Sequence, residues 1–193
     1  MEKRIILTGP AGSGKSRLIR EALGPRLAEA GGFVTQAELS ADGFAEGYAL
    51  VPTAAAAGVE GLERRRFLDC RAWPPRQDNE VFRFYGVQLL REAAYYPFAV
   101  LDELGGTETL IPQFREALYE LLQSDLPLLA ALKTPEDTER WRQVYGLGER
   151  LTAHTDALRR ALADDPDTLV LDLGQLSEAE VRPLLRRWAE EHL

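Results

Sequence analysis

Short apolar runs and stretches of helical periodicity alternate along most of this chain. The apolar runs cover residues 4–8, 98–101, 126–132 and 168–171. Uninterrupted runs of this length are typical of strands that are buried on both faces of a sheet. From residue 98 onward each such run is followed by a periodic segment, and this order predicts a parallel sheet with helices on both faces.

The periodic segments predict helices whose apolar side chains recur every three to four residues. In the last of them, Val181, Leu184, Leu185 and Trp188 form one apolar stripe, and Ser177 opens the helix with the pattern of a capping box. The first helix contains Gly24-Pro25, which breaks or kinks it. A further predicted helix follows Gly86 and carries Val87, Leu90 and Ala94 on one face; the others cover residues 15–30, 111–124, 135–145, 148–164 and 177–192.

Residues 32–85 depart from this alternation, because they contain short β segments and few long helices. A strand begins at Phe33, Asp42-Gly43 is a hairpin signal, and further strands are predicted at 44–51 and 67–73. We expect an antiparallel β excursion after the first helix, forming an edge of the sheet or a flap over the site. The fold class is therefore α/β, a three-layer α/β/α arrangement around a mostly parallel central sheet, with residues 1–193 as a single domain.

A complete G-x-x-x-x-G-K-[ST] motif lies between the first strand and the first helix, which is the context that identifies a P-loop. Its glycines let successive backbone N–H groups point at phosphate oxygens, and the helix N-terminus adds unpaired donors. Lys15 is expected to bridge the β- and γ-phosphates, and the Ser16 hydroxyl to ligate Mg²⁺. The expected nucleotide contacts here are Gly9, Pro10, Ala11, Gly12, Ser13, Gly14, Lys15, Ser16 and Arg17.

Two acidic residues follow the second apolar run and resemble a Walker B strand. We expect Asp102 at the carboxyl end of a strand beside the P-loop strand, where it holds Mg²⁺ together with Ser16. Glu103 is then placed to orient or deprotonate a water molecule aimed at the γ-phosphate. The expected contacts in this segment are Leu101, Asp102, Glu103, Leu104, Gly105 and Glu108.

The transition state of phosphoryl transfer needs cations beyond Lys15. Arg83 is the favoured candidate for a catalytic role, because it precedes a helix that leads to the Walker B strand. Arg115, Lys133 and the run Arg64-Arg65-Arg66 are further candidates that the sequence does not favour individually.

Composition narrows the function classes. The chain has 193 residues and a net charge of −8, which argues against nucleic-acid binding, since such proteins are normally basic. Its one cysteine excludes an internal disulfide and a cysteine metal cluster. No apolar run is long enough to span a bilayer, and a strand with a P-loop stands where a signal peptide needs its apolar segment. We therefore expect a cytoplasmic protein without a membrane partner; its oligomeric state stays open.

Several further segments resemble the THEP-type nucleoside-triphosphatases, the relatives of human cancer-related nucleoside-triphosphatase. The resemblance covers roughly residues 3–133 and implies a RecA-like or kinase-like P-loop fold. It also implies Mg²⁺-dependent hydrolysis of ATP, GTP and other nucleoside triphosphates. Besides the P-loop, the resembling segments are Gly32-Phe33-Val34-Thr35, residues 47–51, Tyr85-Gly86-Val87, residues 101–105, Phe114 and residues 124–130.

This chain departs from the family pattern after Walker B. Family members usually continue with Lys-Met-Glu, whereas this chain has Gly106-Thr107-Glu108, so that a lysine is missing. Near residue 38, Ala37 and Leu39 stand where an acidic and a basic residue are favoured. The chain thus resembles a divergent member, in which the departures bear on hydrolysis and on any second ligand.

Two other functions are compatible with the same residues. A small-molecule or nucleotide kinase would use the P-loop in the same way, with residues 32–85 forming an acceptor pocket and lid. A nucleotide-dependent switch or accessory protein would bind without appreciable turnover. The sequence lacks a guanine-selecting N-K-x-D motif, which disfavours a GTPase switch.

Overall fold

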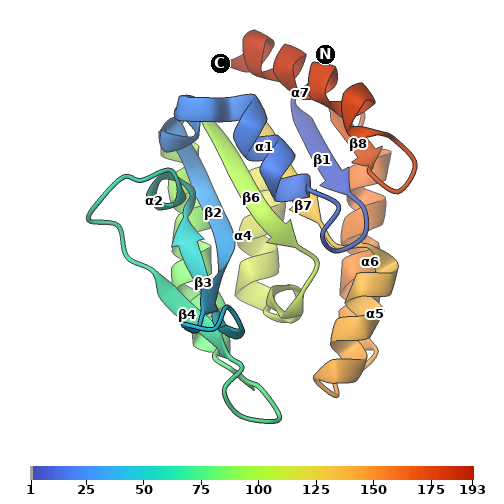
Figure 1. Cartoon of the computed structure of the whole chain (residues 1–193). Coiled ribbons are helices and arrows are strands. Elements are labelled where there is room, and N and C mark those ends of the chain that lie inside the picture. The colour runs from blue at the N-terminus through green and yellow to red at the C-terminus, as the bar shows by residue number, and fades with distance from the viewer. Residues whose placement is uncertain (1) are drawn as a thin grey trace.

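The computed structural model describes residues 2–193; Met1, with which the expected domain begins, lies outside the described residues. One eight-stranded sheet runs through the protein in the order β5-β4-β3-β2-β6-β7-β1-β8 (Figure 1). The strands are β1 (Arg4–Thr8), β2 (Ala30–Leu39), β3 (Ala45–Pro52), β4 (Arg65–Asp69), β5 (Arg76–Gln77), β6 (Phe98–Leu104), β7 (Leu128–Leu132) and β8 (Thr168–Asp172).

The sheet is parallel on one side and antiparallel on the other. β1 pairs in parallel with β7 and β8, and β6 pairs in parallel with β7 and β2. β3, β4 and β5 add to β2 in antiparallel fashion. The predicted fold class, with its antiparallel excursion at one edge, is confirmed. The expectation that Walker B lies directly beside the P-loop strand is wrong, because β7 separates β1 from β6.

Helices cover both faces of the sheet. One apolar core joins α1 and α7 to side chains such as Ile5 and Leu129. The other joins α3, α4 and α6 to the opposite face, where Ile6 and Leu101 point. The helices are α1 (Lys15–Leu23), α2 (Thr53–Ala56), α3 (Val87–Glu92), α4 (Pro112–Leu122), α5 (Pro135–Val144), α6 (Arg150–Asp164) and α7 (Glu178–His192).

The first helix is shorter than predicted. α1 ends at Leu23, and Gly24-Pro25 begins a separate 3-10 segment, η1 (Gly24–Glu29). β2 therefore starts at Ala30 and includes Gly31 and Gly32, which were predicted to end the helix. Gly32 has φ +88°, and a Cβ on it would lie 2.3 Å from the carbonyl oxygen of Val100. This close approach of β2 to β6 requires glycine.

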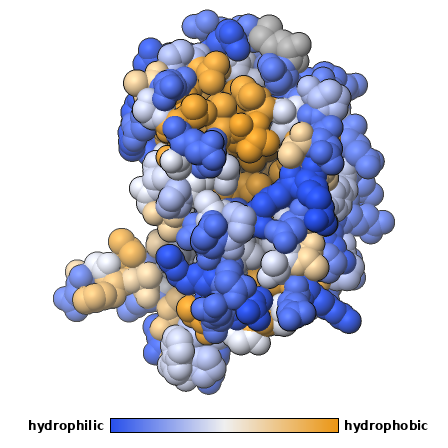
Figure 2. Space-filling model, turned by 90° about the vertical axis from the view of Figure 1, so that its right-hand side faces the viewer, coloured by the Kyte–Doolittle hydropathy of each residue, from blue (hydrophilic) through white to orange (hydrophobic). Residues whose placement is uncertain are grey.

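The two chain ends lie near each other beside α7 (Figure 1), where Trp188 Nε1 donates a 3.0 Å hydrogen bond to the carbonyl of Lys3. β8 forms the sheet edge next to them, and Val170 on this strand is 38% exposed. Figure 2 shows this side of the molecule, with an apolar area enclosed by hydrophilic side chains. No helix among residues 2–193 is both long and apolar enough to cross a membrane.

Candidate active site

The segment between β1 and α1 folds as the P-loop motif predicts. Gly9, Gly12 and Gly14 all have positive φ angles, of 141°, 80° and 89°. A Cβ on Gly9 would lie 2.9 Å from Cβ of Leu173. These positions therefore need glycine, and the loop they form places the N-terminus of α1 at the carboxyl edge of the sheet.

Lys15 lies buried inside this loop. Its Nζ donates to the carbonyls of Gly9 at 2.8 Å and Pro10 at 3.2 Å, and lies 3.4 Å from Oε1 of Glu103. The hydroxyl of Ser13 in the same loop is buried and has no hydrogen-bond partner within the described residues. A buried ammonium held only by loop carbonyls and one carboxylate, beside an unpartnered hydroxyl, is a suitable receptor for phosphate oxygens.

Ser16, at the start of α1, and Asp102 of β6 meet at the carboxyl edge of the sheet, although β1 and β6 are not neighbouring strands. Ser16 Oγ donates a 2.8 Å hydrogen bond to Oδ1 of Asp102. Burial raises the pKa of the Asp102 carboxyl, and the Ser16 hydrogen bond opposes this rise only in part. A divalent cation at this position would relieve that cost of burial, because it attracts the ionised form.

The donor set also fits magnesium. A hydroxyl and a carboxylate are hard oxygen ligands, and Mg²⁺ is commonly held by one or two carboxylates together with substrate phosphates. Over residues 2–193, no group of three or more His, Cys, Asp or Glu side chains is arranged to hold a metal ion. The fit to magnesium therefore depends on Ser16, Asp102 and the nucleotide's own oxygens.

Glu103 lies between two lysines. Its carboxylate accepts a hydrogen bond from Lys133 Nζ and lies near Lys15. Burial alone would raise the pKa of Glu103, but the two lysines outweigh it and hold this pKa below its usual value. The side chain is thus kept ionised in a mostly buried position, as a group that receives a proton must be.

The loop after β6 is held by its own acidic residue. The Glu108 carboxylate accepts hydrogen bonds of 2.8 Å from the backbone N–H groups of both Gly105 and Gly106. Gln77 of β5 donates to Thr107 Oγ1, so that the antiparallel edge also fixes this loop. Burial raises the pKa of Glu108. Glu108 lines the same cavity as Glu103, and its hydrogen bonds shape the loop; its contact with a nucleotide stays a prediction.

A cavity of about 220 Å³ adjoins the P-loop and Glu103. Its polar lining includes Thr35, Thr107 and Lys133, and Ala11 is the P-loop residue that it touches. Its remaining walls are mainly aromatic, from Tyr48, Phe67, Phe82 and Trp141.

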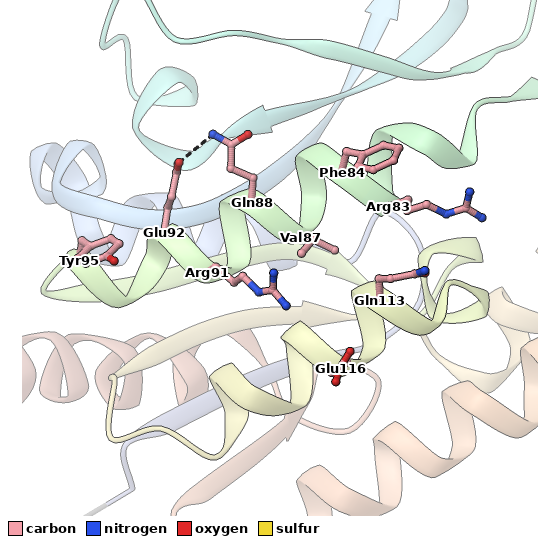
Figure 3. A pocket seen from close by; sticks show the side chains of 9 residues that line it. All are labelled: Arg83, Phe84, Val87, Gln88, Arg91, Glu92, Tyr95, Gln113 and Glu116. Atoms are coloured by element: carbon pink, nitrogen blue, oxygen red, sulfur yellow. Dashed lines mark hydrogen bonds between the residues drawn. The ribbon is translucent and has the colours of Figure 1, made fainter.

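Arg83 does not join this site. It lies on η2 (Val81–Gly86), is ion-paired with Glu80, and lines a different hollow of about 550 Å³ between α3 and α4. In Figure 3 its side chain extends beside Phe84, across from Gln113 of α4. The neighbouring Phe82 faces the active-site cavity instead, because successive positions of a helix point in different directions. The prediction that Arg83 faces the phosphates is therefore wrong, and Lys133, which the sequence did not favour, lies at the site.

Three other predicted contacts lie at the margin of the site. Arg17 lies against Gly14 but pairs with Glu21 and Glu178. Leu101 and Leu104 are fully buried in the core, so that their side chains position β6 and are not exposed to a ligand.

Comparison with known proteins decides the family. A family model described as NTPase matches residues 4–165. The chain belongs to this NTPase family. The resemblance to THEP-type nucleoside-triphosphatases is thereby confirmed, and the chain is an enzyme of the nucleoside-triphosphatase class.

Curated relatives carry the same description. The nucleoside-triphosphatase THEP1 of Methanosarcina acetivorans is 31% identical over 134 residues, which cover 67% of this chain and 75% of that protein. THEP1 of Thermotoga sp. strain RQ2 is 30% identical over 137 residues, which cover 69% and 76%. The crystal structure of THEP1 from Aquifex aeolicus covers 98% of this chain and 96% of its own, with a TM-score of 0.59 at 17% identity, and shows the shared fold.

The lysine missing after Walker B has a counterpart elsewhere in this chain. A Cβ on Gly106 would lie 3.8 Å from Cε of Lys133, so the two positions face the same space. Lys133 follows β7 directly, and it supplies a cation there from a neighbouring strand. The sequence signal that would have favoured Lys133 is its position just after a parallel strand, the same rule that identified Asp102.

Proposed function

We propose that this chain hydrolyses nucleoside 5′-triphosphates, ATP and GTP among them, to the diphosphate and phosphate in a Mg²⁺-dependent reaction. The observation that supports this most is the Glu103 carboxylate, held ionised between Lys15 and Lys133 where the P-loop meets a cavity. Such a carboxylate can accept a proton from a water molecule that attacks the γ-phosphorus.

Each residue would have a separate task in this reaction. The P-loop N–H groups and Lys15 bind the phosphates, and Lys15 exchanges its present carbonyl partners for phosphate oxygens. Water attacks the γ-phosphorus, the bond to the β–γ bridging oxygen breaks, and Glu103 takes the proton. Lys133 keeps the carboxylate ionised and oriented.

Magnesium would be held by Ser16 and Asp102 together with phosphate oxygens. When bound, it supplies positive charge that neutralises the transferring phosphoryl group. Selection of guanine through an N-K-x-D motif is not expected, because the chain's one asparagine, Asn79, is followed by Glu80.

Phosphate release from ATP, GTP, CTP and UTP, with and without Mg²⁺, tests this proposal. We expect release from several nucleotides with Mg²⁺, and loss of at least about 10²-fold in rate in Lys15→Ala and Asp102→Asn. Lys3→Ala is the matched control for the lysine, since Lys3 pairs with Asp125 and Asp167 outside the site. Hydrolysis that proceeds equally without Mg²⁺, or in Lys15→Ala, would contradict it.

A further inference from the structure

The cavity beside Glu103 has walls that hydrolysis does not need. A hydrolase requires room for one attacking water molecule, whose share of liquid volume is about 30 Å³. This cavity has about 220 Å³. Filling this cavity with several water molecules would leave its aromatic walls in contact with water, which is unfavourable because burying apolar surface away from water lowers the free energy.

The aromatic side chains reach the cavity from separate elements. Tyr48 comes from β3, Phe67 from β4, Phe82 from η2 and Trp141 from α5. The rings of Phe67 and Phe82 pack with centroids 4.8 Å apart, so that this wall is rigid. The antiparallel excursion thus supplies the floor of a preformed apolar pocket next to the P-loop.

The same cavity also carries the reactive groups. Glu103 and Lys133 line it, with Ala11 of the P-loop and Thr107 nearby. Lys133 Nζ lies 5.3 Å from the ring centroid of Trp141, so that the charged groups directly adjoin the aromatic wall of the cavity. A molecule in this cavity would place one end on aromatic rings and the other beside the carboxylate.

We propose that the cavity binds a small single-ring alcohol, which competes with water for the γ-phosphoryl group of the nucleotide. The proposal rests on the nucleotide chemistry proposed above and extends it from hydrolysis to phosphotransfer. Drug-sized ligands occupy pockets of about 300–1,000 Å³, so this smaller cavity suits a single ring better than a second nucleotide as acceptor.

The transfer step balances without another reactant. The hydroxyl oxygen of the alcohol forms a bond to the γ-phosphorus, and the bond from this phosphorus to the β–γ bridging oxygen breaks. Glu103 accepts the hydroxyl proton, and the products are a phosphate monoester and the nucleoside diphosphate. Water at the same position gives inorganic phosphate instead.

Phosphorus NMR of reactions with ATP and Mg²⁺ tests this directly. The probes are benzyl alcohol, phenol and 3-(hydroxymethyl)pyridine, with ethanol at equal concentration as the hydroxyl that lacks a ring. We expect a monoester signal from at least one ring alcohol, formed about tenfold faster than from ethanol, which corresponds to the stacking contribution of the aromatic walls.

Pocket variants separate this cavity from the hydrolytic groups. Thr35→Leu narrows the cavity, and Tyr48→Leu removes one of its rings. We expect the first to lower monoester formation at least about tenfold, and the second to raise KM for the alcohol with little change in kcat. Monoester formation is expressed relative to phosphate release without alcohol in the same variant, so that a general loss of activity does not count, and Thr152→Leu on α6 is the control that should change neither rate.

The outcomes distinguish the two proposals. Hydrolysis without monoester from any ring alcohol, or equal transfer to ethanol, overturns the ring-alcohol site and leaves the hydrolase. Transfer that Thr35→Leu does not reduce also overturns it, because the product would then form outside the cavity. Monoester formation without hydrolysis in the absence of alcohol would retain this site and overturn the hydrolase.

Discussion

Glu103 is mostly buried and still ionised, because its carboxylate is paired with two lysines. Lys15 comes from the P-loop and Lys133 from the end of β7. Once nucleotide draws Lys15 to the phosphates, Lys133 remains as the cation that offsets the burial of Glu103. Lys133 is therefore the residue on which the protonation state of the proposed base depends.

Replacing Lys133 with methionine tests this dependence. Burial then acts on Glu103 with less opposition, so its pKa rises and the acidic limb of the pH dependence of kcat moves to higher pH. We expect kcat at neutral pH to fall by about 10²-fold. Rate measurements across pH check both effects, with Lys3→Met as the control; an acidic limb that does not move would refute the role of Lys133.

At the scale of elements, the carboxyl ends of β1, β6 and β7 bring the site together. The apolar runs and the P-loop motif predicted these strands, and Asp102 and Glu103 with them. The insertion of β7 between β1 and β6 could not be read from the sequence, because strand order depends on packing between distant segments. Arg83 was preferred because it precedes a helix that leads to β6, and its direction away from the site is set by the packing of η2, α3 and α4.

The contact of β2 with β6 gives a second prediction, built on a pair of glycines. Gly32 and Gly43 have similar φ angles of 88° and 82°, but only Gly32 of this pair is crowded, because a Cβ on it would lie 2.3 Å from the carbonyl oxygen of Val100. Gly43→Ala should cost about 1–2 kcal/mol of the free energy of unfolding, from the backbone conformation alone.

Gly32→Ala adds the steric conflict and should cost more than about 3 kcal/mol. Urea denaturation of both variants measures the difference. Equal losses of unfolding free energy in the two variants would show that β2 and β6 can move slightly apart without cost, so that their contact does not require glycine at position 32.

Over the whole molecule, the sheet joins two halves with different tasks. The parallel half holds the P-loop and the proposed magnesium ligands, and the antiparallel half contributes the aromatic floor of the cavity and fixes residues 105–108 through Gln77. The sequence predicted an antiparallel excursion near the site. Its aromatic contribution was hidden because Tyr48, Phe67 and Phe82 lie on separate elements and meet only after the sheet forms.

Burial of Glu108 makes the stability of the molecule depend on pH. The pKa of Glu108 in the folded protein lies above the ordinary value of 4.5. The contribution of its protonated carboxyl to the free energy of unfolding is therefore fully present below pH 4.5, and it is lost as the pH rises through the raised pKa of the folded protein. Glu108→Gln retains an oxygen that can accept the N–H groups of Gly105 and Gly106. We expect this variant to be more stable than the wild type at pH 8 and not at pH 4.

Thermal unfolding from pH 4 to pH 8 measures this difference. Asp102, whose pKa is also raised by burial, accounts for part of the slope that remains in the variant. A variant that is less stable than the wild type by the same amount at every pH would contradict this account of Glu108.

Single-turnover hydrolysis of ATP by Glu103→Gln, combined with measurement of nucleotide affinity, tests the central claim most directly. We expect an affinity within about threefold of the wild type and a hydrolysis rate lower by at least about 10²-fold, because glutamine cannot accept the proton. An unchanged hydrolysis rate with intact binding would show that Glu103 is not the proton acceptor.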